Sequence, residues 1–286
     1  MPDLYQVKSF SNERSQGNLA GVVTCAESLS DVDMQCIATF VGASETVFIL
    51  PSAKADFHFR WFTPNTEVGM CVHATIAALG VMKTEDKILK EIIHIETKHT
   101  ILVSRIREDN IFIDIPGYQL ISRSELNANV LSFLTLSPSQ LVGMPGIIKI
   151  FDDRELIIEV KSFDDLRHLK PTQQNYSEVC RSLKVTGISI FTQKTLDPSN
   201  QIHTREFAPL YGYLEDPLCG MAAGAISTYL GSKKPLRVEQ GYFCDTSGII
   251  LVESGEENTI SVGGTCCISE HIPDFDIPFT DGFSGF

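Results

Sequence analysis

Hydrophobic and polar residues alternate along the chain in short blocks, and most of these blocks have the two-residue period of β-strands. Many are rich in Val, Ile and Phe, which favour strands. The pattern predicts strands at residues 4–8, 20–25, 44–50, 57–62, 92–97, 100–106, 110–115, 147–150, 155–160, 186–191, 248–252 and 259–262.

Residues 30–42 have the pattern of a surface helix. Ser30 and Asp33 form a capping box at its start, and Gly42 can end it. A second such helix is expected at 173–183. The apolar face of the first is expected to comprise Val32, Cys36, Ile37 and Phe40.

Two further helices have no polar face, one beginning near Cys71 and one near Cys219. A helix that is apolar on all sides is buried. We therefore expect each of them to lie at the centre of a folded unit.

The segment before each buried helix is repeated. Arg60-Trp61-Phe62-Thr63-Pro64 matches Arg205-Glu206-Phe207-Ala208-Pro209, with an offset of 145 (205 − 60), and the cysteines that follow are offset by 148 (219 − 71). The strands that follow repeat as well, since Ile101 and Ile249 are also 148 positions apart (249 − 101). Two features at one offset indicate an internal duplication. We expect an N-terminal domain of residues 1–117 and a C-terminal domain of residues 118–268. The linker is placed at 118–130, and the tail 269–286 is expected to pack onto the first domain.

The predicted fold is α+β, with two domains related by a pseudo-twofold axis, each a strongly curved mixed sheet or barrel around a central buried helix. Both helix N-termini would then face one cleft. Their unpaired N–H groups and partial positive charge suit a carboxylate.

Composition narrows the function. The chain has 286 residues, 43% of them hydrophobic, and a net charge of −13, which argues against a nucleic-acid partner. No segment is long and apolar enough for a membrane span, no secretory signal is visible, and no nucleotide-binding motif occurs. The eight cysteines follow no metal-binding spacing, so we expect no metal and a reduced, cytoplasmic setting.

Glu45 is the strongest candidate for chemistry. Aligning Phe48 with Phe191 places it opposite Ile188, so only the first half has a carboxylate there. A glutamate among apolar residues can act as a general acid or base near neutral pH. The plainer interpretation is a solvated glutamate at a strand end.

Other candidates flank the two buried helices. His73 is either a core histidine or a site residue, and Asp216 either a cap or a site residue. Asn18 is a turn residue or a ligand contact. Cys71 and Cys219 are two buried thiols or a facing pair at helix N-termini, where the pKa of a thiol falls.

These residues resemble the phenazine-biosynthesis isomerase (PhzF-like) family over nearly the whole chain. The resemblance lies in Gly17-Asn18-x-Ala20, Ser44-Glu45-Thr46-x-Phe48, Arg60-Trp61-Phe62-Thr63-Pro64 to Cys71-x-His73-Ala74-Thr75, and Glu215-Asp216-Pro217 to Gly220. It implies the diaminopimelate epimerase-like fold, a homodimer, and a cofactor-independent isomerase acting on a small carboxylate. Carried over by motif, Glu45 is the proton shuttle, and His73 and Asp216 line the pocket. The implied substrate contacts are Asn18, Cys71, Val72, Cys219, Gly220 and Met221.

The sequence departs from the family pattern at Val72, where a glycine is usual, and at Met221, where a serine is usual, so the phenazine substrate itself is not carried over. Cys71 and Cys219 also stand where related racemases have their catalytic cysteines. Two alternatives therefore remain beside the Glu45 mechanism. One is a two-cysteine racemase or epimerase of an amino or hydroxy acid, and the other is a non-catalytic metabolite-binding protein.

Overall fold

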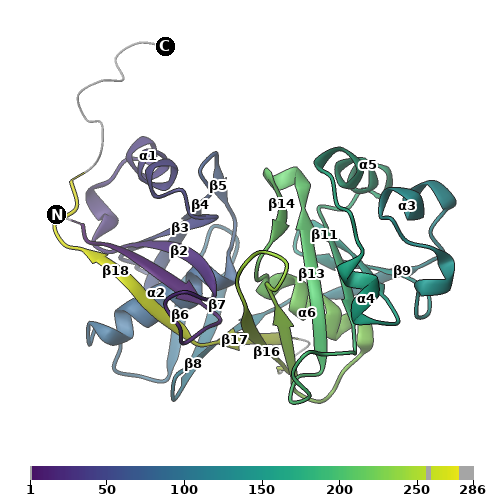
Figure 1. The fold of residues 1–286 in the computed structure, drawn as a ribbon. Helices are drawn as coiled ribbons and strands as arrows, with labels where there is room; N and C mark the ends of the chain where they lie inside the picture. Colours follow the sequence, from purple (N-terminus) through teal and green to yellow (C-terminus); the bar gives the residue numbers. More distant parts are fainter. Residues whose placement is uncertain (1, 256–258, 277–286) are drawn as a thin grey trace, which may run out of the picture. The chain divides into compact units, whose positions relative to one another are not determined.

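The computed structural model describes residues 2–255 and 259–276. The chain forms two compact units (Figure 1). Unit 1 comprises Met1–Ile113 and Gly263–Phe286, and unit 2 comprises Asp114–Val262. The sequence-based division assigned residues 263–268 to the second half, whereas in the structure they lie in unit 1.

Unit 1 is a mixed sheet in the order β18–β1–β2–β3–β4–β6–β7, in which β2–β3 and β4–β6 are parallel pairs and the other pairs are antiparallel. The short strand β5 adds to β4. The strands are β1 (Leu4–Ser9), β2 (Asn18–Val23), β3 (Glu45–Leu50), β4 (Phe57–Phe62), β5 (Glu67–Val68), β6 (Ile92–Glu96), β7 (Ile101–Arg107) and β18 (Cys266–Ile272), and the helices are η1 (Ala26–Ser28), α1 (Asp31–Val41) and α2 (Val72–Thr84).

Unit 2 is a mixed sheet in the order β9–β10–β11–β12–β13–β15–β16, in which β11–β12 and β13–β15 are the parallel pairs and β14 adds to β13. The chain passes between the units within β8 (Asn110–Ile115) and β17 (Ile260–Gly264). The strands are β9 (Gln119–Arg123), β10 (Gly146–Ile150), β11 (Asp153–Glu159), β12 (Gly187–Thr192), β13 (Ile202–Ala208), β14 (Tyr213–Asp216), β15 (Leu236–Gln240) and β16 (Gly248–Ser254), and the helices are α3 (Ala128–Phe133), η2 (Pro138–Gln140), α4 (Phe163–Arg167), α5 (Gln173–Leu183), η3 (Pro209–Tyr211) and α6 (Gly220–Leu230).

The two units share one topology. In each, an antiparallel pair is followed by a parallel step, an antiparallel step and a second parallel step, and the buried helix follows the short strand. The predicted α+β class is confirmed, and the repeated topology agrees with the duplication inferred from the sequence.

The two central helices are buried as their composition predicts. In α2 the eleven residues from Val72 to Met82 are all buried, and α2 packs against β1, β2, β3 and β18 (Figure 1). In α6 eight of eleven residues are buried, and this helix packs against β9, β10, β11 and β16. Across residues 2–255 and 259–276, no helix combines the length and apolarity that a membrane span requires.

The repeated Arg-x-Phe-x-Pro segment is an interaction motif within each unit. Arg60 lies over the ring of Phe62 at 5.2 Å and forms two hydrogen bonds with the Glu67 carboxylate, of 2.8 and 3.0 Å. Arg205 repeats the arrangement, 5.1 Å from the Phe207 ring and bonded to Glu215 at 2.8 and 2.6 Å. Two-pronged bonding of this kind fixes the loop that leads into each central helix.

The surface helix α1 begins and ends where the sequence predicts. Ser30 and Asp33 form the capping box, and Gly42 is the C-cap at φ 66°. The predicted apolar face is right for Ile37, which is buried, but wrong for Val32 and Phe40, which are 69% and 56% exposed. The helix is turned so that Met34, Ile37 and Ala38 face the sheet, where they pack against Phe48, Phe62 and Phe275.

The expected linker at 118–130 is also wrong. Gln119–Arg123 is the strand β9, paired with β10, and Asn127 caps α3 through a hydrogen bond from the Val130 amide. All five residues of β9 are exposed, so the strand has no apolar alternation to reveal it. Residues 269–276 of the tail belong to unit 1, where the Phe275 amide donates to the Pro2 carbonyl. Residues 277–286 lie outside the described part of the chain.

The orientation of α1 leads to a simple stability prediction. Met34→Ala should lower the free energy of unfolding by about 2–4 kcal/mol, because it removes a fully buried side chain. Val32→Ala, two residues away on the exposed side, should change it by less than about 0.5 kcal/mol. Urea denaturation of both variants checks this, and equal effects would contradict the observed face.

Candidate active site

The residues singled out in the sequence form two groups, one in each unit. Asn18, Glu45, Cys71, Val72 and His73 belong to unit 1, around the start of α2. Asp216, Cys219, Gly220 and Met221 belong to unit 2, around the start of α6. That both groups line one cleft stays a prediction.

Glu45 is the first residue of β3, and its side chain points toward α2. The alternation of the strand places Phe48 on the opposite face, in the α1 cluster, while Glu45 approaches His73. Glu45 is only 7% exposed. The interpretation of Glu45 as a solvated strand-end glutamate is therefore wrong.

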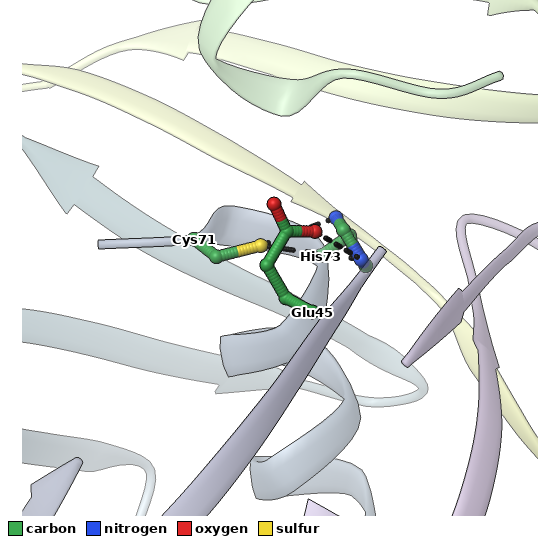
Figure 2. A group of neighbouring side chains, drawn as sticks. All are labelled: Glu45, Cys71 and His73. Atoms are coloured by element: carbon green, nitrogen blue, oxygen red, sulfur yellow. Dashed lines mark hydrogen bonds and ion pairs between the residues drawn. The ribbon is translucent and has the colours of Figure 1, made fainter. Parts of the chain in front are cut away.

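His73 lies at the centre of the unit 1 group. Its Nε2 atom is 3.4 Å from Glu45 Oε2 and 3.2 Å from Ser44 Oγ, and its Nδ1 atom is 3.2 Å from Cys71 Sγ and 3.5 Å from Asn18 Nδ2. The sequence therefore selected four residues that the fold brings together, as Figure 2 shows for three of them. Ser44 joins them as part of the same motif.

The imidazole of His73 is neutral at physiological pH. Burial lowers its pKa to about 4, against a smaller opposing effect of a hydrogen bond to the Leu19 backbone. The amide nitrogen of Asn18 can only donate, so Nδ1 is the acceptor. The ring hydrogen is then on Nε2, the atom that lies 3.4 Å from Glu45 Oε2, and the Leu19 carbonyl accepts a hydrogen bond from the ring.

Cys71 is the N-cap of α2, in an extended conformation with φ −146° and ψ 122°. Its sulfur makes no capping bond to the helix and instead approaches His73. Its carbonyl accepts from the Thr75 hydroxyl at 2.6 Å and the Thr75 amide at 3.1 Å. As in any helix, the backbone N–H groups of the first turn have no acceptor within α2 itself, and a helix start of this kind suits an anion.

In unit 2, Gln240 ties the turn between β14 and α6 together. Its side-chain nitrogen Nε2 donates to the Asp216 backbone carbonyl at 2.8 Å, and its side-chain oxygen Oε1 accepts from the Cys219 backbone N–H at 3.2 Å. Asp216 Oδ1 accepts from the Leu218 amide at 3.1 Å, the turn role that the plainer interpretation expected. The Met221 carbonyl accepts from the Tyr118 hydroxyl at 3.1 Å.

Cys219 is the N-cap of α6, as Cys71 is of α2. Burial raises the pKa of the Cys219 thiol well above its usual value, and the carboxyl groups of Asp216 and Glu206 raise it further. The expected lowering of this pKa by the helix N-terminus is therefore outweighed. Cys219 is a thiol, not a thiolate, at neutral pH.

A buried carboxyl pair, which the sequence analysis missed, lies on the face of the unit 2 sheet turned away from the α5 side. Glu155 in β11 and Glu206 in β13 share a hydrogen bond, and Ser189 Oγ lies 3.0 Å from Glu155 Oε1 and 2.5 Å from Glu206 Oε2. Neighbouring residues of the same strands, Leu156 in β11 and Phe207 in β13, point to the opposite side, into the cluster around α5. The sequence signal for this pair was a glutamate next to an apolar residue in each of the two strands.

The strand registers also correct the alignment of the two halves. Arg60 pairs with Phe48, and Arg205 pairs with Ile190, so the offset in this strand is 142 (190 − 48). The counterpart of Glu45 is therefore Gly187 (45 + 142), not Ile188. A Cβ atom at Gly187 would lie 2.2 Å from Glu155 Oε2 and 2.7 Å from Glu206 Oε1. The second half thus carries carboxyl groups at the equivalent place, supplied by the neighbouring strands.

The chain matches the PhzC-PhzF family model, described as phenazine biosynthesis-like protein, over residues 7–271. The chain belongs to this family. An isomerase of Clostridium acetobutylicum, itself uncharacterised, is 33% identical over 88% of this chain and 89% of its own. The crystal structure of the Bacillus anthracis PhzF-family protein has a TM-score of 0.86 at 25% identity and covers 95% of this chain and 98% of that one.

The epimerase-like fold is confirmed by a more distant structure. A probable proline racemase of Agrobacterium radiobacter has a TM-score of 0.62 at 12% identity, covering 99% of this chain and 94% of that one. The family and the names of its members bear out the prediction of an isomerase at the level of that class.

The carboxyl pair makes a prediction about pH. Burial, and for Glu206 the neighbouring Glu155 as well, raises the pKa of both groups, that of Glu155 from 4.5 to about 7 and that of Glu206 well above its usual value. The folded state therefore binds more protons than the unfolded state, so this contribution to stability is present at low pH and is lost as pH rises from about 4.5 through 7. Glu206→Gln removes one ionisable group, and we expect its free energy of unfolding, relative to the wild type, to be higher at pH 8 than at pH 5.

Urea denaturation at both pH values measures the difference, which can reach about 1.4 kcal/mol per pH unit for each proton. Glu125→Gln, which removes an exposed glutamate of the same unit, is the matched control and should retain the pH dependence of the wild type. Identical pH dependence in Glu206→Gln and wild type would contradict the assignment.

Proposed function

We propose that this chain is a cofactor-independent isomerase that moves a proton within a small cyclic or unsaturated carboxylate. Glu45 is the acid/base group. The observation that carries the proposal is the buried Glu45 carboxyl, 3.4 Å from the neutral His73 imidazole at the start of α2.

In this mechanism the Glu45 carboxylate takes a proton from one carbon of the substrate, and the resulting carboxylic acid returns it to another carbon. Glu45 returns the proton that it removed, so the reaction needs no cofactor. His73 donates from Nε2 and holds the carboxyl in place without putting a positive charge beside it. The free N–H groups at the start of α2 bind the substrate carboxylate.

The remaining contacts enter the proposal through the family resemblance. They are a substrate-orienting role for Asp216 and contacts from Asn18, Val72, Gly220 and Met221. Met221 places a thioether where the family pattern has a hydroxyl, so the substrate of this chain differs from that of the phenazine isomerase in the group that meets this side chain.

The two-cysteine racemase is the second candidate, because Cys71 and Cys219 are both N-caps of central helices. That mechanism needs a thiolate on one side and a thiol on the other. The raised pKa of Cys219 opposes thiolate formation there, and Cys71 is bonded to His73. Both facts favour Glu45 as the base.

Hydrogen exchange in heavy water separates the two. Wild-type protein is incubated with a panel of cyclic and unsaturated carboxylates and of amino and hydroxy acids, and deuterium uptake at carbon is followed by NMR. Glu45→Gln should lower the exchange rate by about a hundredfold or more, whereas Cys219→Ser should leave most of it. Glu27→Gln, an exposed glutamate in the same unit, is the matched control.

Loss of exchange in Cys71→Ser and Cys219→Ser, with Glu45→Gln unaffected, would favour the racemase. A wild-type protein that neither exchanges nor shifts its melting temperature with any member of the panel would overturn both mechanisms in favour of metabolite binding of another kind.

A further inference from the structure

A groove of about 390 Å³ lies in unit 1 where β4 meets β5 and β6. The last two residues of β4 pair with β5, and the first two pair with β6. The middle of β4, Phe59 and Arg60, therefore lies between the two pairings. None of the residues that line the groove belongs to the group around His73. Its charged and imidazole side chains are Lys54, His58, Arg60, Glu67, Glu96 and Lys98.

Unit 2 has the same framework at this place. In unit 1 His58 of β4 pairs with Glu96 of β6, and in unit 2 His203 of β13 pairs with Glu239 of β15. The arginine of each Arg-x-Phe-x-Pro segment follows the histidine by two positions. The groove lining of unit 1 therefore has a residue-by-residue counterpart in unit 2.

In unit 2 aromatic side chains cover these residues. Seven residues, 241–247, join β15 to β16, and the ring of Phe243 from this loop lies 4.4 Å from the Arg205 guanidinium. The rings of Tyr242 and Phe243 lie 5.3 and 5.9 Å from the His203 ring. As a result, the side chains of Arg205 and His203 are only 7% and 0% exposed.

Unit 1 leaves the equivalent space open. Only four residues, 97–100, join β6 to β7, and none of them is Phe, Tyr or Trp. Within the described part of the chain, Phe62 is the one ring that lies over the Arg60 guanidinium, at 5.2 Å. The Arg60 side chain is 20% exposed, and His58 is half-buried. The groove thus corresponds to the space that Phe243 fills in unit 2.

We propose that this groove binds a small aromatic carboxylate, whose ring takes the place over Arg60 that Phe243 takes over Arg205. A guanidinium is attracted to the face of an aromatic ring and stacks on it. The volume of the groove falls within the range of small-molecule sites.

The charges of the groove favour an acid as the ligand. Two ion pairs of 2.9 and 2.8 Å engage both carboxylates of the lining, Glu96 with Lys54 and Glu67 with Arg60. The Lys98 ammonium has no ion pair among the described residues, so the lining carries one positive charge in excess, in a chain of net charge −13. Asp31 of α1 also bonds to Arg60, but it is 80% exposed and does not line the groove. A ligand carboxylate beside Lys98 balances the excess charge.

Ring-current shifts in NMR spectra test for an aromatic ligand in the groove. The imidazole resonances of His58, assigned by their loss in His58→Gln, should move saturably on titration with benzoate, because the ligand ring lies where aromatic rings lie beside His203. Cyclohexanecarboxylate has the same charge without an aromatic face, and benzyl alcohol has the ring without the charge. Each should bind about two- to fivefold more weakly than benzoate.

Variants separate the contributions of ring and charge. Lys98→Ala should weaken benzoate binding about two- to fivefold and leave the binding of benzyl alcohol unchanged. Lys149→Ala, which removes an exposed lysine of unit 2, is the matched control and should bind both as the wild type does. Arg60→Lys keeps the charge but loses the planar face, and should remove the preference for benzoate over cyclohexanecarboxylate.

Melting curves check the folding of each variant, and the comparison of ligands on the wild type tests the proposal even if Arg60→Lys fails to fold. The groove does not depend on the proposed acid/base chemistry, so Glu45→Gln should keep the His58 shift. Absence of a saturable His58 shift in the wild type, or equal affinity for benzoate and cyclohexanecarboxylate, overturns the proposal. A shift that disappears in Glu45→Gln assigns the binding to the group around His73 and overturns it as well.

Discussion

The structure of each unit depends on burying a helix that is apolar on every side. Such a helix cannot lie on a flat sheet with one face in water, because half of its apolar surface would stay exposed. In unit 1, α2 is accordingly covered along its length, with β1, β2, β3 and β18 among the elements that contact it. The same burial brings the polar first turn of α2 into the interior. Its backbone donors and His73 must find partners there, and Asn18, Ser44 and Glu45 lie on the strands and loops that surround it.

The second unit meets the same constraint with different chemistry. Its topology repeats that of unit 1, and the Arg–Phe–Glu arrangement before the central helix is the same in both. At the start of the third strand, however, unit 1 has Glu45 beside Ala20, and unit 2 has Gly187 beside Glu155. In unit 2 the neighbouring strands supply two carboxyl groups at this place, and Ser189 Oγ is hydrogen-bonded to both. A pair of carboxyl groups in direct contact must share a proton, whereas a single carboxyl beside a neutral histidine can give and take one.

Much of this could be predicted from the sequence, and the failures have physical causes. The repeat, the two central helices, the bounds of α1 and α5 and the grouping of Asn18, Glu45, Cys71 and His73 follow from periodicity, capping and motif. The buried face of α1 could not be predicted in full, because Val32 and Met34 are both apolar side chains and only the packing of the helix shows which of them is buried. The strand β9 was missed since an exposed edge strand needs no apolar alternation. Glu155 and Glu206 lie 51 positions apart (206 − 155), and only the pairing of β11 and β13 with β12 brings them together.

The contacts around His73 bear on which residue we propose as the base. A neutral imidazole has one donor and one acceptor nitrogen. Asn18 donates to Nδ1, which also lies 3.2 Å from the Cys71 sulfur, and Nε2 lies 3.4 Å from Glu45 Oε2. A chain of contacts therefore runs from Cys71 through His73 to Glu45. In the mechanism that we propose, Glu45 is the member of this chain that meets the substrate C–H, and His73 separates it from Cys71.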